Sequence, residues 1–213
     1  MDNFNASLHF NRVRLCGQVL TAPAPSHVNH GESFFRFLLS VPRLSGHCDE
    51  LPVIISRQRL EETPVAVGDT VSIAGQLRSF NNKNAAGPRL ILSVFVHRLS
   101  LCPGGAPLNV IRLCGTVCKA PTLRCTPLGR EICDMILAVN RRYDRADYLP
   151  CIAWGAVAEK AAALPVGSVF AVEGRIQSRH YTKQLPEGTF QRTAYEVSVM
   201  HPLDPEELMF DFL

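Results

Sequence analysis

The sequence predicts an all-β protein made of two tandem five-stranded barrels, each with one short helix between its third and fourth strands. Three observations lead to this prediction: a long internal repeat, short runs in which apolar and polar residues alternate, and turn residues along the whole chain. The 15 prolines and 14 glycines are scattered through the 213 residues, as expected for many short strands joined by turns.

The internal repeat appears when the sequence is shifted by 98 residues. Residues 14–17 (RLCG) then fall on the identical residues 112–115. Between 11–58 and 109–156, sixteen of 48 positions are identical, whereas unrelated sequences would share about three. After one inserted residue the repeat resumes at an offset of 99. One domain has therefore been copied, and we expect an N-terminal domain at 1–102, a short proline-stiffened linker at 103–108, a C-terminal domain at 109–203 and a tail at 204–213.

The second copy shows the predicted elements most clearly. Its five strands are expected at 109–117, 129–140, 148–154, 168–179 and 190–201, with a turn at 185–188 between the last two. The Ala-rich stretch 156–164, closed by Pro165, is the one helical segment. Five strands with a single helix between the third and fourth are the layout of the OB-fold, a small barrel that commonly binds oligonucleotides.

Composition and spacing narrow the classes of function. A net charge of +3 permits nucleic-acid binding without demanding it, and neither a signal peptide nor a membrane-spanning apolar run is visible. The eight cysteines are therefore expected to be reduced, and four of them (16, 114, 133 and 151) to be buried in strands. Neither the cysteines nor the seven histidines have the spacing of metal ligands, and the acids are scattered. We expect no metal, no cofactor and no enzymatic activity.

Five motifs of the second copy occur in a fixed order: NVIRLCG at 109–115, TPLG at 126–129, LAVNRRY at 137–143, DYLPCIAW at 147–154 and VEGRIQSRHY at 172–181. With these motifs, residues 109–200 resemble the bacterial single-stranded DNA-binding protein (SSB) family. The first copy shares only part of the pattern and resembles a more distant member. The resemblance implies an OB-fold that binds single-stranded DNA without sequence preference.

The resemblance places base-stacking aromatic residues at Tyr143, Tyr148, Trp154 and Tyr181. Binding a single strand without reading its sequence requires flat ring faces for the bases and cations along the phosphate path. The neighbouring cations expected on that path are Arg141, Arg142, Arg175, Arg179 and Lys183 in the second copy, and Arg43, Arg78 and Lys83 in the first. Two alternatives stay open: Trp154 could be half buried in the core, and Arg175 could pair with Glu173 or with a partner subunit.

The first copy lacks most of these rings. Where the second copy has Tyr143, Tyr148 and Trp154, the first has serine, glutamate and serine, and Phe80 alone keeps the aromatic character. Attraction to phosphates would survive in such a domain while stacking would mostly be lost. We therefore expect the first copy to bind DNA weakly or to contact proteins instead.

The tail has the acidic and aromatic character of the segment with which SSB proteins dock partner enzymes, but lacks the family's Pro-Phe ending and its linker. The residues expected to contact replication or repair proteins are Glu206, Glu207, Phe210, Asp211 and Phe212. The alternative is a terminal segment that folds back on a barrel through its apolar side chains.

The expected function is binding and protection of single-stranded DNA during replication, recombination or repair, in the bacterial cytoplasm at the nucleoid and away from membranes. Two barrels per chain suggest a homodimer presenting four OB-folds, by analogy with the family. The alternative is an OB-fold scaffold of a primosome or recombination complex that binds nucleic acid weakly. RNA also stays open as the ligand, since stacking does not distinguish the sugars.

Overall fold

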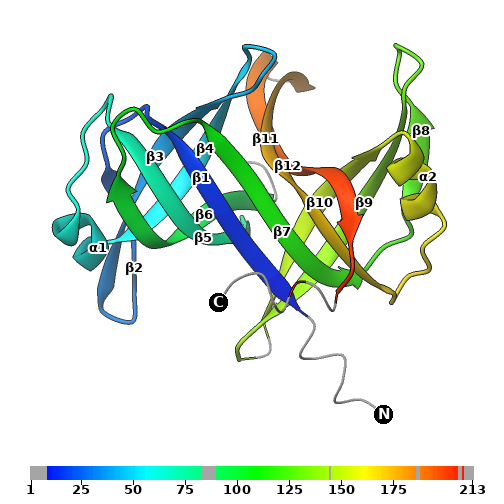
Figure 1. Cartoon of the computed structure of the whole chain (residues 1–213), viewed down its shortest axis with the longest axis horizontal. Helices are drawn as coiled ribbons and strands as arrows, with labels where there is room; N and C mark the ends of the chain where they lie inside the picture. Colours follow the sequence, from blue (N-terminus) through cyan, green and yellow to red (C-terminus); the bar gives the residue numbers. More distant parts are fainter. Residues whose placement is uncertain (1–8, 83–89, 144, 186–187, 206–207, 209–213) are drawn as a thin grey trace.

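The computed structural model describes residues 9–82, 90–143, 145–185, 188–205 and 208, with the side chains of Lys183 and Leu185 excepted. Two β-barrels lie side by side, the first in blue to green and the second in green to red (Figure 1). Twelve strands form one continuous sheet that closes on itself twice. The structure therefore confirms the prediction of an all-β chain with two tandem OB-fold barrels.

The first barrel contains six strands and one helix. They are β1 (Phe10–Val19), β2 (Ala24–Asn29), β3 (Glu32–Pro42), β4 (Cys48–Ser56), α1 (Arg57–Glu62), β5 (Thr70–Asn81) and β6 (Leu90–Leu101). The barrel closes because β1 pairs with both β3 and β5, while β4 pairs in parallel with β6. Alternation along these strands turns residues such as Leu15, Leu39 and Leu51 fully inward.

The second barrel repeats this order. Its elements are β7 (Leu108–Val117), β8 (Thr122–Cys125), β9 (Glu131–Arg141), β10 (Arg145–Trp154), α2 (Ala156–Ala162), β11 (Val169–Leu185) and β12 (Gly188–Leu203). The five predicted strands and the helix are all present. β8 and its counterpart β2 were not predicted, because every residue in them is exposed and no alternation marks them. The β11–β12 hairpin is longer than predicted, since its arms pair up to Leu185 and Gly188.

Strands β1 and β7 pair antiparallel and join the two barrels. Their register is symmetric with respect to the two copies of the repeat. Val13 pairs with Ile111, which is the equivalent residue of the second copy, and Asn11 and Leu15 pair symmetrically with Leu113 and Asn109. The repeat is therefore also a pseudo-twofold arrangement in space. Each barrel keeps the same internal bond: Asn11 donates to the carbonyl oxygen of Leu77 at 2.7 Å, and Asn109 donates to that of Ile176 at 2.7 Å.

Two buried aspartates hold the barrels together away from this junction. Asp49 of the first barrel accepts the Ser178 amide at 2.8 Å, and Asp147 of the second accepts the Ser79 amide at 2.8 Å. Both carboxylates are fully buried. A buried carboxylate must be paired, and these two are paired with arginines as well as amides. We call these two contact sets the aspartate clasps; they fix the orientation of one barrel against the other.

The remaining predictions about packing concern the cysteines and the end of the chain. The cysteines at 16, 114, 133 and 151 are buried, as predicted, and the described cysteines are all free thiols. Leu208 is buried against Cys114 and Ala171, so this part of the tail packs on the second barrel. Within the described ranges, no helix combines the length and apolar character that crossing a bilayer requires.

Candidate nucleic-acid interface

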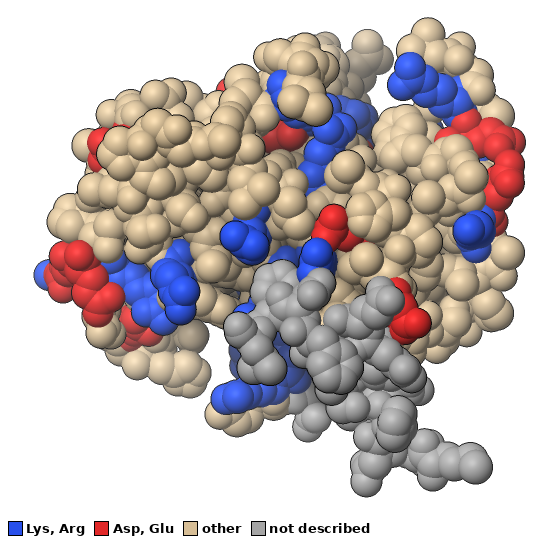
Figure 2. All heavy atoms as spheres, in the orientation of Figure 1, with Lys and Arg blue, Asp and Glu red and all other residues tan. Residues whose placement is uncertain are grey.

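Two grooves of about 1010 Å³ each lie where the barrels meet. In the first groove, β5 and β6 of the first barrel face the β9–β10 turn of the second barrel. In the second groove, β11 and β12 of the second barrel face the β3–β4 turn of the first. The pseudo-twofold relates the two grooves, because each combines the same strands of one barrel with the same turn of the other. Figure 2 shows Lys and Arg along the middle of the visible face, while Asp and Glu gather mainly at the outer ends.

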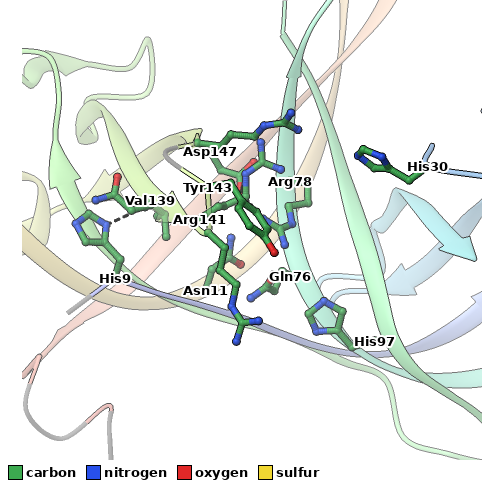
Figure 3. Close-up of a pocket in the computed structure, with 13 residues that line it drawn as sticks. His9, Asn11, His30, Gln76, Arg78, His97, Val139, Arg141, Tyr143 and Asp147 are labelled. Atoms are coloured by element: carbon green, nitrogen blue, oxygen red, sulfur yellow. Dashed lines mark hydrogen bonds and ion pairs between the residues drawn. The ribbon is translucent and has the colours of Figure 1, made fainter. Parts of the chain in front are cut away.

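The first groove is cationic. Figure 3 shows Tyr143 and Arg141 on one side of it and His30 and His97 on the other. Its only acid among the described residues is Asp147, which is buried and paired with arginines. The lining residues are His9, Asn11, His30, Gln76, Arg78, His97, Val139, Asn140, Arg141, Arg142, Tyr143, Arg145 and Asp147.

The second groove holds an exposed indole among arginines. Trp154 ends β10 with 36% of its surface exposed, and its Nε1 donates to Ser198 Oγ on β12 at 3.2 Å. This bond fixes the ring while leaving part of it open to the groove, so Trp154 is neither a core residue nor a free rotor. The arginines of this groove are Arg43, Arg124, Arg130, Arg175 and Arg179, and His47 and His180 also line it.

Arg175 of the second groove has a hydrogen-bond donor, its buried Nε, without a partner among the described residues. Glu173, the partner considered from the sequence, is instead paired with Arg112 and His201. Burial, followed by the neighbouring Arg43, lowers the pKa of Arg175. A phosphate at this guanidinium would relieve both penalties.

Three of the predicted phosphate ligands have a structural partner as well. Arg43 donates to Asp49 through Nε at 2.8 Å, Arg78 donates to Asp147 at 3.1 Å, and Arg141 lies 3.4 Å from Asp147. All three line a groove. Their role toward DNA stays a prediction. Arg78 also joins the barrels by pairing with Asp147 of the other barrel, whereas Arg43 and Arg141 each pair with the aspartate of their own barrel. Arg142 is exposed in the first groove and Arg179 in the second.

The other sequence-predicted residues are more scattered. Tyr181 lies on the β11 arm with the Arg179 guanidinium 5.6 Å from its ring centroid. Tyr148 and Phe80 are 49% and 41% exposed, and neither lines a groove. The Lys183 side chain lies outside the described residues, as do Lys83, Glu206, Glu207, Phe210, Asp211 and Phe212.

Sequence reasoning missed that both grooves are shared between the barrels. The resemblance placed Tyr143 among the stacking residues of the second copy but did not indicate that it lines a groove shared with the first barrel. Sequence reasoning also missed a cluster of rings on the first barrel, described below. An offset comparison finds equivalent positions but carries no signal for contacts between the copies. Among the described residues, no three His, Cys, Asp or Glu side chains gather as they would around a metal ion.

The second barrel is similar in sequence to known single-stranded DNA-binding proteins. Residues 108–202 match the Single-strand binding protein family. Single-stranded DNA-binding protein A of Bacillus subtilis is 36% identical over 106 residues, which are 46% of this chain and 61% of that protein. Single-stranded DNA-binding protein 2 of Listeria innocua is 41% identical over 81 residues, 35% of this chain and 51% of that protein. The chain thus spans about half to three fifths of the curated relatives it matches.

One solved structure has the architecture of the whole chain. The wild-type single-stranded DNA binding protein from Thermus aquaticus superposes with a TM-score of 0.72, covering 92% of this chain and 93% of that one. The sequence identity of 22% means that this likeness concerns the fold alone. Both barrels, and not only the second, are therefore included in the shared architecture.

Proposed function

We propose that this chain, whose residues 108–202 match the single-strand binding protein family, binds single-stranded DNA without sequence specificity. The protein would act by binding and protecting the strand in the cytoplasm during replication, recombination or repair, without catalysing a reaction on it. The observation that carries the proposal is the second groove, in which a hydrogen-bonded, half-open Trp154 lies among arginines.

The residues of the second groove divide between two tasks. The Trp154 ring offers a base a π-face, and a stacked base contributes about 1–3 kcal/mol. Arg175 and Arg179 lie along the same groove and supply donors for phosphates. Tyr181, held beside Arg179, extends the aromatic surface along the hairpin arm. Because a ring face and a guanidinium do not discriminate among bases, this arrangement favours a ligand of any sequence.

Trp154 is the one tryptophan of the chain, so its fluorescence directly monitors the second groove. Titration with oligo-dT at several salt concentrations should quench this fluorescence, with an affinity that falls steeply as salt rises. The double variant Arg175→Ala/Arg179→Ala should flatten the salt dependence, by about 0.7 in the logarithmic slope for each phosphate that the variant no longer binds. The matched control Lys160→Ala removes an exposed cation from α2, outside both grooves, and should leave the titration unchanged.

Absence of quenching in a folded sample would contradict the proposal and favour the alternative of a protein-binding scaffold. Binding to oligo-U with equal affinity would extend the ligand to RNA, since the groove residues named here contact bases and phosphates.

We also propose a homodimer, which would bring four barrels together. Sedimentation equilibrium should then give twice the 23.5 kDa of one chain.

We further propose that the tail docks replication or repair proteins, although Leu208 is buried on the barrel. Removing residues 209–213 should abolish capture of such a partner while leaving DNA binding intact.

A further inference from the structure

The first barrel carries a ring cluster that its alignment with the second barrel conceals. The ring of His27 on β2 stacks on Phe34 of β3, with centroids 4.9 Å apart and planes 9° apart. Phe34 contacts Phe95 of β6 at 5.6 Å, and Phe95 contacts His97 at 5.9 Å. His27 and His97 are exposed at the two ends, while Phe34 is buried and Phe95 half-buried between them; we call these four residues the ring track. The track ends in the first groove, because His97 is one of its lining residues.

The pairing registers show how the ring track replaces Trp154. In the second barrel Trp154 pairs with Ile132, and in the first barrel Ser56 pairs with Phe34. The aromatic residue has thus moved from one strand to its neighbour. Phe95 in the first barrel is likewise equivalent to Ser198 in the second. Ile54 pairs with Phe95, and the equivalent Ile152 pairs with Ser198.

Ser56 has a structural role at the start of α1. Its side chain accepts the Arg59 amide and caps the start of α1. In the second barrel Gly155, with φ of +53°, precedes α2 without a side-chain cap, so Trp154 remains available for the groove. Replacement of the tryptophan in the first copy therefore did not remove aromatic character from that face of the barrel.

A ring from the other barrel lies across the first groove. Tyr143 sits in the β9–β10 turn with φ of +63° and is 90% exposed. This turn is not a loose loop relative to the first barrel, because the Asp147 clasp binds the Ser79 amide and the Arg78 guanidinium. Tyr143 on the second barrel and His97 on the first are thus held as opposite walls of one cavity (Figure 3).

The charge of the first groove suits a polyanion. Arg142 and Arg145 are exposed beside Tyr143, and the lone described acid, Asp147, is buried and neutralised. The Arg78 guanidinium lies 5.9 Å from the Phe95 ring centroid, which places a cation next to the ring track as well. Cations interleaved with exposed rings are the composition of a single-strand path.

We propose that the first groove is a second single-strand-binding site, built jointly by both barrels, in which Tyr143 of the second barrel and His97, the exposed end of the ring track of the first, take up bases. Arg142 and Arg145 hold the phosphates. This inference rests on the proposed function, because it extends the same strand to another site. The first barrel is then a binding domain with displaced rings, completed by a residue of its neighbour.

The test is a measurement of how many nucleotides each chain occludes. The variant Tyr143→Ala/His97→Ala changes two exposed side chains and should fold normally, as a circular dichroism melt would verify. In stoichiometric titrations with poly-dT at low salt, the occluded length per chain should fall by about half, since one of two similar sites is removed. Quenching of Trp154 by an oligonucleotide short enough for one groove should remain. The control Lys160→Ala should change neither readout.

Photo-cross-linking locates the strand independently. Oligo-dT carrying 5-iodouracil, irradiated with the full chain and digested, should yield adducts at Tyr143 or His97 in addition to Trp154. Quenching of Trp154 with an unchanged occluded length and with adducts in the second groove alone would overturn this inference and leave the proposed function intact. Loss of all quenching and all adducts would overturn both.

Discussion

The two barrels keep the same scaffold and differ in where their rings lie. Both have an Asn that bridges to the backbone of the fifth strand of the barrel (β5 or β11), and both contribute one Asp to a clasp with the other barrel. Trp154 of the second barrel lines the second groove, whereas the first barrel carries the His27–Phe34–Phe95–His97 track, whose exposed His97 lines the first groove. Groups that hold backbone together tolerate little change, because their partners are buried. Exposed rings are freer to differ between the copies, since no buried partner fixes their position.

The largest effect is expected at the clasps, where the barrels should behave alike. Asp49→Ala and Asp147→Ala should each lower the free energy of unfolding by about 3–5 kcal/mol, because each leaves half-buried arginines and a buried amide without their acceptor. Urea unfolding would measure both. Glu61→Ala, which breaks the exposed pair with Arg57, is the control and should change stability very little, because solvent screens this pair. A small loss in only one clasp variant would show that the pseudo-symmetry does not extend to energetics.

The bulge glycines offer a second matched pair. A Cβ at Gly75 would lie 2.2 Å from the Phe95 carbonyl oxygen, and one at Gly174 would lie 2.2 Å from that of Ser198. Gly75→Ala and Gly174→Ala should therefore each cost about 1–3 kcal/mol in stability through overpacking. Thermal unfolding of the two variants would compare them. Ser72→Ala, at an exposed position of the same strand as Gly75, is the control and should change stability by at most about 0.5 kcal/mol.

Removing aromatic side chains from the two barrels should lower DNA affinity by different amounts. Trp154→Ala should weaken oligo-dT binding by about 1–3 kcal/mol, whereas Phe80→Ala, outside both grooves, should have little effect. Adding Tyr148→Ala and Tyr181→Ala to Trp154→Ala should widen the difference further. Fluorescence anisotropy with a labelled oligonucleotide would measure all of these variants. Equal losses from the triple variant and from Phe80→Ala would remove the distinction between the two sets of rings.

The smallest expected effect is on the pH dependence of the free energy of unfolding, through two histidines. Burial lowers the pKa of His97 from its usual 6.5, helped by nearby Arg78, and burial also lowers the pKa of His9. The unfolded chain therefore takes up protons at these sites before the folded chain does. Stability should be full above about pH 6.5 and decline as the pH falls below that value. His97→Met, which introduces the second barrel's residue at this position, should make the decline between about pH 7 and pH 5 shallower in urea unfolding. An unchanged slope would contradict the assignment.

The fold was predictable because the duplication and the strand alternation are both properties of local sequence. Alternation predicted buried positions such as Leu113 and Leu137, and the repeat extended the same assignment to the first barrel. The exposed strands β2 and β8 could not be predicted, since hydrogen bonding to β3 and β9 defines them and no side chain is buried. The base-stacking role assigned to Trp154 came from a family resemblance, and the structure adds the bond to Ser198 that orients the ring.

By itself, the sequence determined that one five-stranded barrel occurs twice, which strands face inward, and which copy retains the aromatic pattern of the SSB family. These properties depend on residues close together in the chain or on comparison at a constant offset. The tertiary structure alone decided that β1 and β7 join the barrels, that Asp49 and Asp147 bind the opposite barrel, and that Tyr143 faces the first groove. Contacts between residues about 70 to 130 positions apart leave no periodic trace in the sequence, because the packing of the two barrels creates them.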